Sequence, residues 1–449
     1  MTSHIPNTPP PGWSRAQVRS ATRAVYTAFI GNGFLFASWA ARIPQVRDGL
    51  RVSPGALGLI LLSIAVGSTI ATPLSGLVIT WLGDSRTVAV MSLTAAAGMA
   101  TVAVGYTYGI PPVVAGLFLF GFSSGTWDVA MNVQGAAVEQ ALGRAIMSRF
   151  HAGWSIGTVA GAGAGAAMVA LGVPVTAHLL VAALLVAATV PIAARRFLPH
   201  ARAPAHDGTV PAGTVHAGTV PAGTVHAGTV PAGTVPAGTV HADTVHRDRP
   251  AARRSPLRAW TEPRTLVIGV FVLCMAFTEG TSNDWLSLAV IGGYHTAAAL
   301  GTLTFAVFLA AMTTGRWFGP AFIDRYGRVR MLRVCAATAL GGLLLIEAGR
   351  VLPAALAGAA LLGLGTSLGF PVGISAAADD PRYAPGRVST AASIGYLAFL
   401  AGPPSIGFLA DHVGVLRGLS VAGALLIVAF ILCPVTAPIS PSGQGSDNS

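Results

Sequence analysis

Long apolar stretches recur along this chain, separated by short polar segments. Each is long enough to cross a lipid bilayer as a helix, which takes about 20 residues. Six stretches lie in the first part of the sequence, at residues 22–41, 55–80, 87–106, 111–137, 150–172 and 174–194. Six more follow at residues 264–290, 297–320, 331–348, 352–376, 388–410 and 413–434. The pattern predicts an all-α integral membrane protein with twelve transmembrane helices in two six-helix bundles.

The same pattern divides the chain into five regions. They are an N-terminal tail at 1–21, a first bundle at 22–194, a linker at 195–260, a second bundle at 261–434 and a C-terminal tail at 435–449. Within the linker a five-residue unit, Ala-Gly-Thr-Val followed by Pro or His, is repeated. A segment this rich in Gly, Pro and Thr buries too little apolar surface to offset its chain entropy. We therefore expect a disordered linker.

The two bundles repeat one another in sequence. In the first, LFGFSSGTWDVAMN is followed by Gly143-Arg144 and then by Ser-Ile-Gly at 155–157. In the second, LLGLGTSLGF is followed by Gly386-Arg387 and then by Ser-Ile-Gly at 393–395. Transporters are often built from two related bundles of this kind, so the echo predicts a pseudo-symmetric pair.

Composition and charge narrow the class of protein. Hydrophobic residues make up 53% of the chain and charged residues 10%, whereas soluble domains carry roughly 25% charged residues. A water-soluble globule is therefore excluded. The net charge of +11 comes without a basic recognition element, so we expect no nucleic-acid partner. The three cysteines lack CxxC or metal-ligand spacing, and we expect neither a metal nor a cofactor.

The basic residues predict the orientation in the membrane. All 27 Lys+Arg residues are arginine, and most fall in the tail, the linker and the loops on the same side. The positive-inside rule then places both termini and the linker in the cytoplasm of a bacterial inner membrane. No small-residue cleavage site follows the first apolar stretch, so we expect an uncleaved first helix.

One loop has the spacing of a known family signature. GPAFIDRYGRVR supplies Asp324, Arg325, Gly327 and Arg328 in the pattern DRxGR. It resembles the signature loop of the major facilitator superfamily, which implies the major facilitator fold and a gating latch on the cytoplasmic side. Ordinary flanking charges are the alternative interpretation. In the equivalent loop of the first half, GLVITWLGDSR, Thr80 occupies the position of the aspartate, so no latch is expected there.

Further strings resemble one branch of that superfamily. FASWAARIPQVRD, SGTWDVAMNVQGAAVE, FHAGWSIG, EGTSNDW and LAGPPSIGFLADHVG are similar to the fucose-permease-like branch. The resemblance implies uptake of a sugar or another small polar solute together with protons. Fucose permease is expected to use an acid in its first helix, whereas the main polar group here is Asn32. Efflux of an amphipathic drug-like compound or metabolite is the alternative, although the fifth helix lacks the Gly-Pro motif common in exporters.

Polar side chains in the middle of predicted helices are candidate sites, because charges in hydrocarbon are costly. Asp128 lies at helical spacing from Ser124 and Asn132, which puts all three on one face. We expect this face to bind protons or substrate, or else to serve as a structural hydrogen-bond anchor. Glu279 and Asn283 share a face of the seventh helix and form a second candidate, with the same two interpretations.

Two charged residues near the outer ends of helices suggest a second gate. Arg42, after the first helix, is positioned to pair with Asp284 of the seventh if the repeat symmetry brings these helices together. A snorkelling arginine is the alternative. A Walker-type phosphate loop and the clustered His or Asp of a membrane enzyme are both absent from the sequence. We expect a monomeric transporter, not an enzyme, with a small-molecule substrate, protons and the lipid bilayer as its partners.

Overall fold

A computed structural model describes residues 13–143, 146–199, 256–349, 351–380 and 383–439. The part of the predicted linker at 200–255 lies outside the described residues, as do most of both predicted tails. Every regular element in the described ranges is a helix. The all-α prediction is therefore confirmed for this part of the chain.

The first half contains seven helices. They are α1 (Arg15–Ala40), α2 (Ile43–Leu50), α3 (Pro54–Leu82), α4 (Asp84–Gly105), α5 (Ile110–Leu142), α6 (Met147–Ala170) and α7 (Val175–Ala194). The second half begins with a 3-10 turn, η1 (Pro256–Thr261). It continues with α8 (Pro263–Tyr294), α9 (Ala298–Tyr326), α10 (Arg328–Gly349), α11 (Leu352–Thr366), α12 (Gly369–Ala377), α13 (Ala384–Val413), α14 (Val415–Gly418), α15 (Ser420–Leu432) and η2 (Cys433–Thr436).

These helices account for the twelve predicted spans. In the described ranges ten helical segments are long and apolar enough to cross a membrane, or eleven if α1 and α2, bent by 43°, form one span. The remaining predicted span is α6, a helix of 24 residues that is not among these segments. The tenth predicted span is broken into α11 and α12, and the twelfth into α14 and α15.

The repeat seen in the sequence is also present in the backbone. Gly83 and Gly327 end α3 and α9 with φ of +74° and +83°, a left-handed region that side chains with a Cβ rarely adopt. A Cβ on Gly121 of α5 would lie 2.1 Å from the carbonyl oxygen of Ile64 in α3, and one on Gly363 of α11 would lie 2.2 Å from that of Phe308 in α9. The same close helix crossing therefore occurs once in each half.

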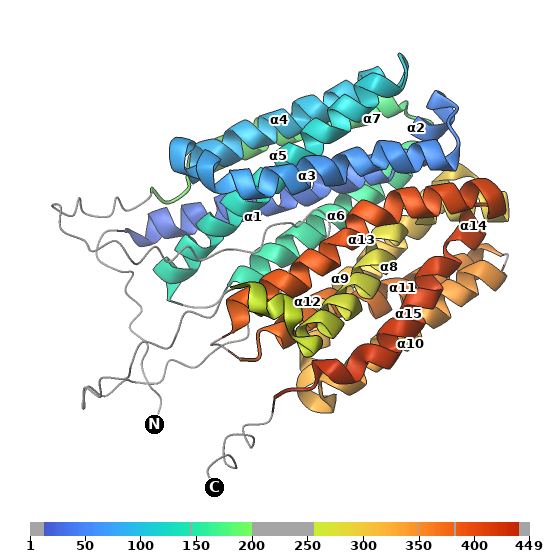
Figure 1. The fold of residues 1–449 in the computed structure, drawn as a ribbon. Coiled ribbons are helices and arrows are strands. Elements are labelled where there is room, and N and C mark those ends of the chain that lie inside the picture. Colours follow the sequence, from blue (N-terminus) through green and yellow to red (C-terminus); the bar gives the residue numbers. More distant parts are fainter. Residues whose placement is uncertain (1–12, 144–145, 200–255, 350, 381–382, 440–449) are drawn as a thin grey trace, which may run out of the picture.

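The helices pack in matching pairs within each half. In the first half α1 packs on α6, α3 on α5, and α4 on α5 and α7. In the second half α8 packs on α13, α9 on α11, and α10 on α11 and α15. Figure 1 shows the two halves as separate groups of helices, blue to teal and yellow to red. They meet where α3 lies against α13 and where α6 lies against α9, two contacts that the pseudo-symmetry relates.

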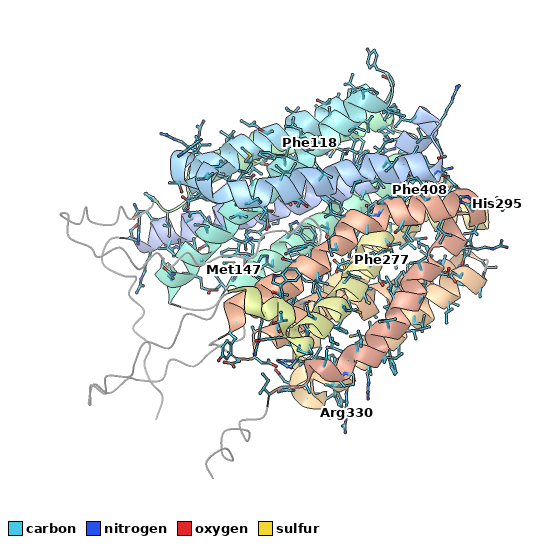
Figure 2. All side chains as sticks on the ribbon, in the orientation of Figure 1. Phe118, Met147, Phe277, His295, Arg330 and Phe408 are labelled. Carbon is cyan, nitrogen blue, oxygen red and sulfur yellow. The ribbon has the colours of Figure 1, made fainter. Side chains whose placement is uncertain are left out.

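The two ends of the second half can be told apart by labelled side chains. His295, directly after α8, and Arg330, near the start of α10, lie at opposite ends of this half in Figure 2. The His295 end is also where α2 and α14 lie in Figure 1, and the Arg330 end is where α1 begins. We call these the α14 end and the α10 end. By the arginine distribution, the α10 end is the predicted cytoplasmic side.

Candidate functional site

The halves are joined closely at the α14 end. The carboxylate of Asp411, in α13, accepts hydrogen bonds from the backbone N–H of Gly55 (3.1 and 3.2 Å) and the hydroxyl of Ser53 (3.2 Å) at the start of α3. A Cβ on Gly58 of α3 would lie 2.4 Å from the carbonyl oxygen of Pro403, so the two backbones touch here. We call this contact the α3–α13 seal. It closes one end of the interface between the halves.

A cavity lies at the second contact between the halves, toward the opposite end. It has a volume of about 290 Å³ between the first turns of α6 and the later turns of α9. Its lining consists of Ser148, Arg149, Ala152, Ser155, Thr313, Arg316, Trp317 and Pro320. We call it the α6–α9 cavity. The α3–α13 seal and the α6–α9 cavity thus lie toward opposite ends of the interface between the halves. A second, larger hollow of about 700 Å³ lies at the α14 end beside the seal, with Arg47, Pro54 and Arg417 in its lining.

An ion pair stands at the inner wall of this cavity. Nη2 of Arg316, in α9, lies 2.7 Å from Oε1 of Glu279, in α8, and the two side chains are only 10% and 1% exposed. Arg316 Nε also donates to the carbonyl oxygen of Ser367 at 3.3 Å. That carbonyl lies in the break between α11 and α12, where a helix leaves backbone acceptors unused. Two other segments of the second half, α8 and the α11–α12 break, thus hold the guanidinium of α9.

Sequence reasoning missed Arg316. It lies inside α9, ten residues before the helix ends at Tyr326. The signal that was available is its position inside the eighth predicted apolar stretch, 297–320, where a charge is costly. Glu279, by contrast, was predicted, and the structure gives it a partner that the sequence did not suggest.

Polar residues of the first half form a separate network. Asn32 of α1 donates to the hydroxyl of Ser124 in α5 at 3.1 Å and accepts from Trp154 Nε1 of α6 at 3.1 Å. Asn32 and Ser124 are buried. These bonds tie three helices together, so in this conformation both side chains hold the bundle rather than face the α6–α9 cavity.

Asp128 lies toward the other half. Its carboxylate is half-buried and within electrostatic reach of the Tyr396 hydroxyl in α13. Asn132 donates to the backbone oxygen of Asp128 at 2.9 Å. The predicted face of α5 is therefore divided: Ser124 bonds inside the first half, and Asp128 interacts electrostatically with a residue of the second half.

Asn283 is buried, one turn after Glu279 in α8. Its Oδ1 has no hydrogen-bond partner among the described residues. Trp285 in α8 and Trp39 in α1 are buried in the core, so neither is placed to stack on a solute here. Of the predicted pair in the seventh helix, Glu279 lies behind Arg316 of the cavity wall, and Asn283 supplies a buried acceptor nearby in the sequence.

The predicted ion pair between Arg42 and Asp284 is not formed in this structure. Arg42 instead donates from Nε to Nδ1 of His178 at 2.9 Å and from Nη2 to the carbonyl oxygen of Val173 at 3.0 Å. Its side chain is 2% exposed, so it does not snorkel either. Both acceptors belong to the first half, one in α7 and one just before it.

The signature loop makes its contacts inside the second half. Arg328 Nη1 lies 2.9 Å from Asp379, and Arg264 Nη2 lies 3.0 Å from the same carboxylate. Asp324 and Arg325 are exposed, at the end of α9. Arg328 therefore pins the start of α10 to the segment after α12. The predicted latch role of Asp324, Arg325, Gly327 and Arg328 is not visible as a bridge between the halves in this conformation.

The equivalent position in the first half carries an acid. Asp84 follows Gly83 as Arg328 follows Gly327, and it accepts a hydrogen bond from Gln134 in α5. The two loops thus use opposite charges for the same task, which is to fix a helix start to its own half. In the described part of the chain, His, Cys, Asp and Glu side chains do not form a group of three able to hold a metal ion.

Comparison with known proteins identifies relatives over most of the chain. Residues 25–391 match the sequence profile of the Major Facilitator Superfamily. An uncharacterized MFS-type transporter of Yersinia pestis is 30% identical over 417 residues, covering 91% of this chain and 92% of that protein. An uncharacterized transporter of Sinorhizobium fredii is 28% identical, covering 92% and 97%. Membrane protein MosC of Rhizobium meliloti is 25% identical, covering 88% and 85%.

Solved structures share the fold. The nucleoside transporter NupG superposes with a TM-score of 0.68 at 12% identity, covering 92% of this chain and 98% of that one. A bacterial homologue of the human lysosomal transporter Spinster, in an inward-facing and unoccupied conformation, gives a TM-score of 0.63 at 10% identity, covering 96% and 100%. At these identities the likeness concerns the arrangement of helices alone.

Proposed function

The chain belongs to the Major Facilitator Superfamily, and we propose that it moves a small polar solute, such as a sugar, across the bacterial inner membrane together with protons. That it is a multi-pass membrane transporter follows from the family and its transporter relatives. The solute, the coupling ion and the cytoplasmic location of both termini belong to the proposal. So does the fucose-permease-like branch, which is supported by the sequence strings given above.

The observation that carries the proposal is the buried Glu279–Arg316 ion pair beside the α6–α9 cavity. Buried pairs are expensive because both charges leave water, and ionisable groups inside membrane helices usually serve transport. Protonation of Glu279 removes its charge and releases the guanidinium of Arg316. A proton and a solute that both act on Arg316 then bias the same conformational equilibrium, which is the requirement for coupling.

The positions of seal and cavity support alternating access. The α3–α13 seal closes the α14 end, while the α6–α9 cavity lies toward the α10 end. With the α10 end in the cytoplasm, the proposal assigns this conformation to a state that takes up or releases solute on the inside. Movement of the two halves about their paired contacts would open the other side.

Asp128 is the second acid of the proposal. It faces Tyr396 across the boundary between the halves, so its charge changes surroundings whenever the halves move. A carboxylate with that position is suited to carry the coupling proton in one state and lose it in the other. Glu279 then controls Arg316, and Asp128 responds to the separation of the halves.

The test is transport by the purified full-length chain in proteoliposomes. A panel of sugars and other small polar solutes is first screened for thermal stabilisation, because a ligand stabilises the state it binds. We expect a stabilising solute to accumulate when the lumen is made alkaline and to exchange without a gradient. Accumulation that is the same with and without the pH gradient would refute proton coupling. Movement of the solute out of the liposomes against its own concentration gradient would favour the efflux alternative.

Orientation has its own test. Reporter fusions at either terminus or within residues 195–260 are expected to report the cytoplasm, because the arginines gather on that side. A fusion partner that is active only outside the cytoplasm, at any of these three positions, would overturn the assigned orientation.

A further inference from the structure

The α6–α9 cavity has an uneven charge. Two arginines line it, Arg149 from the first half and Arg316 from the second, together with the hydroxyls of Ser148, Ser155 and Thr313. Among the described residues, no acidic side chain belongs to the lining; Glu279 lies behind Arg316 and neutralises that one guanidinium. The wall of the cavity therefore presents positive charge and hydrogen-bond donors to whatever occupies it.

Arg316 has hydrogen-bonding capacity left over. Its Nη2 bonds to Glu279 and its Nε to Ser367, but its buried Nη1 has no partner among the described residues. A buried charged donor without an acceptor is costly, and charge-assisted bonds are the strong ones. An oxygen atom of a bound solute is the natural acceptor. Carboxylate and phosphate match the fork of a guanidinium best.

We propose that the solute carries an anionic oxygen group, such as a carboxylate, which binds Arg316 with help from Arg149 in the α6–α9 cavity. This inference rests on the proposed transport function and names the class of its substrate. A cavity of about 290 Å³ suits a small solute such as a sugar acid.

The charge balance follows from the ion pair. When Glu279 is ionised it competes with the anion for Arg316, and when it takes up a proton Arg316 is free for the anion. One proton and one monovalent anion therefore enter together, and the occupied site has the same net charge as the empty one. Transport of this solute is electroneutral, whereas a neutral sugar moving with a proton would carry charge.

The binding test uses matched pairs of small molecules on the purified full-length protein. Glucuronate and glucose form one pair, nicotinate and nicotinamide a second, and thermal stabilisation is measured across concentrations. We expect at least one anion to stabilise the protein while its neutral partner does not. Equal stabilisation by both members of a pair, or none by either anion, overturns the inference.

Variants locate the site. Arg316→Gln is expected to weaken binding of the stabilising anion by about 10- to 100-fold, the usual effect of losing a charged hydrogen-bond donor. Exposed Arg149→Gln is expected to weaken it by about threefold, since solvent screens its charge. Arg330→Gln, an exposed arginine of α10 away from the cavity, is the matched control and is expected to have no effect.

Two further variants separate binding from folding. Glu279→Gln imitates the protonated acid and is expected to tighten anion binding about threefold or more, because Arg316 loses its competitor. The double variant Glu279→Gln with Arg316→Gln keeps the site neutral, so it is expected to fold and yet not bind. Unchanged binding in the folded double variant would overturn the assignment of Arg316.

Transport separates this inference from the function on which it rests. In proteoliposomes the anion is expected to accumulate when a pH gradient is imposed. A potassium diffusion potential is expected to leave this accumulation unchanged. A neutral solute that accumulates with the pH gradient while no anion binds would refute the anionic substrate and leave proton-coupled transport standing. An anion that binds through Arg316 but does not follow the pH gradient would refute proton coupling and leave the site standing.

Discussion

Removing one partner of the Glu279–Arg316 ion pair is expected to destabilise the fold strongly. The two charged atoms are 2.7 Å apart, and Coulomb's law with an effective dielectric constant of about 20 gives an attraction of about 6 kcal/mol at that distance. Desolvation offsets part of this attraction. Glu279→Gln or Arg316→Gln alone leaves a buried charge uncompensated, which costs about 3–5 kcal/mol of unfolding free energy.

Removing both charges is expected to cost far less. In the double variant no buried charge remains, and the two amide side chains keep a hydrogen bond, so we expect stability within about 1 kcal/mol of the parent. The double-mutant cycle then yields a coupling energy of at least about 5 kcal/mol. Unfolding is followed by loss of helical circular dichroism as the mole fraction of SDS rises in mixed micelles.

A second ion pair of similar geometry is the control. Arg387 Nε lies 2.6 Å from Glu262 Oε2, but these side chains are 18% and 24% exposed. Solvent screens their interaction, so the same cycle with Glu262→Gln and Arg387→Gln is expected to give about 1 kcal/mol or less. If the Glu279 and Arg316 variants each cost under about 1 kcal/mol and simply add, the pair is not the buried interaction described here.

Three further predictions follow from other contacts. Asp128→Asn is expected to abolish accumulation driven by a pH gradient while exchange persists; normal accumulation in proteoliposomes would leave this residue a structural role. Asp411→Asn removes the charge that caps α3, an interaction worth ~1 kcal/mol. Spin labels at Asp48 and Arg417, one in each half at the α14 end, are therefore expected to move apart. An unchanged distance between the labels would refute the seal. The hydrogen bond from Arg387 lowers the pKa of the Glu262 carboxyl below its usual 4.5. The Glu262–Arg387 pair therefore stabilises the fold fully above pH 4.5. Its contribution is lost as the pH falls through the lower pKa of the folded state. Acid melts of Glu262→Gln are expected to lack this step, and an identical pH profile would contradict the assignment.

The apolar pattern alone determined where most of the membrane-spanning segments lie along the chain. The predicted stretch 55–80 is α3 (Pro54–Leu82), and 174–194 is α7 (Val175–Ala194). Membrane helices satisfy their own backbone hydrogen bonds and need a fixed length of apolar residues, so each one is encoded locally. The repeat was equally readable, because Gly121 and Gly363 make the same close helix crossing within each half.

The breaks in the helices were less accessible. The stretch 352–376 looks continuous, yet the structure divides it at Ser367 and turns that carbonyl toward Arg316. Glycine and serine on both sides of the break are compatible with a helix and with a turn. The feature that favours the turn over a continuous helix is the guanidinium of Arg316, which needs an acceptor and belongs to another helix, α9.

Candidate residues were recognised as chemical types and not as partners. A carboxyl group in the middle of an apolar helix marked Asp128 and Glu279, because such a group is costly in lipid wherever it faces. The packing of the helices decided which residue lies next to each of these groups. Tyr396 lies near Asp128, Arg316 binds Glu279, and Arg42 donates to His178 instead of pairing with Asp284. Local sequence fixes where a span begins and what it carries. Contacts between residues more than 30 positions apart depend on how helices rotate and cross, and those are set by the whole bundle, which only the tertiary structure specifies.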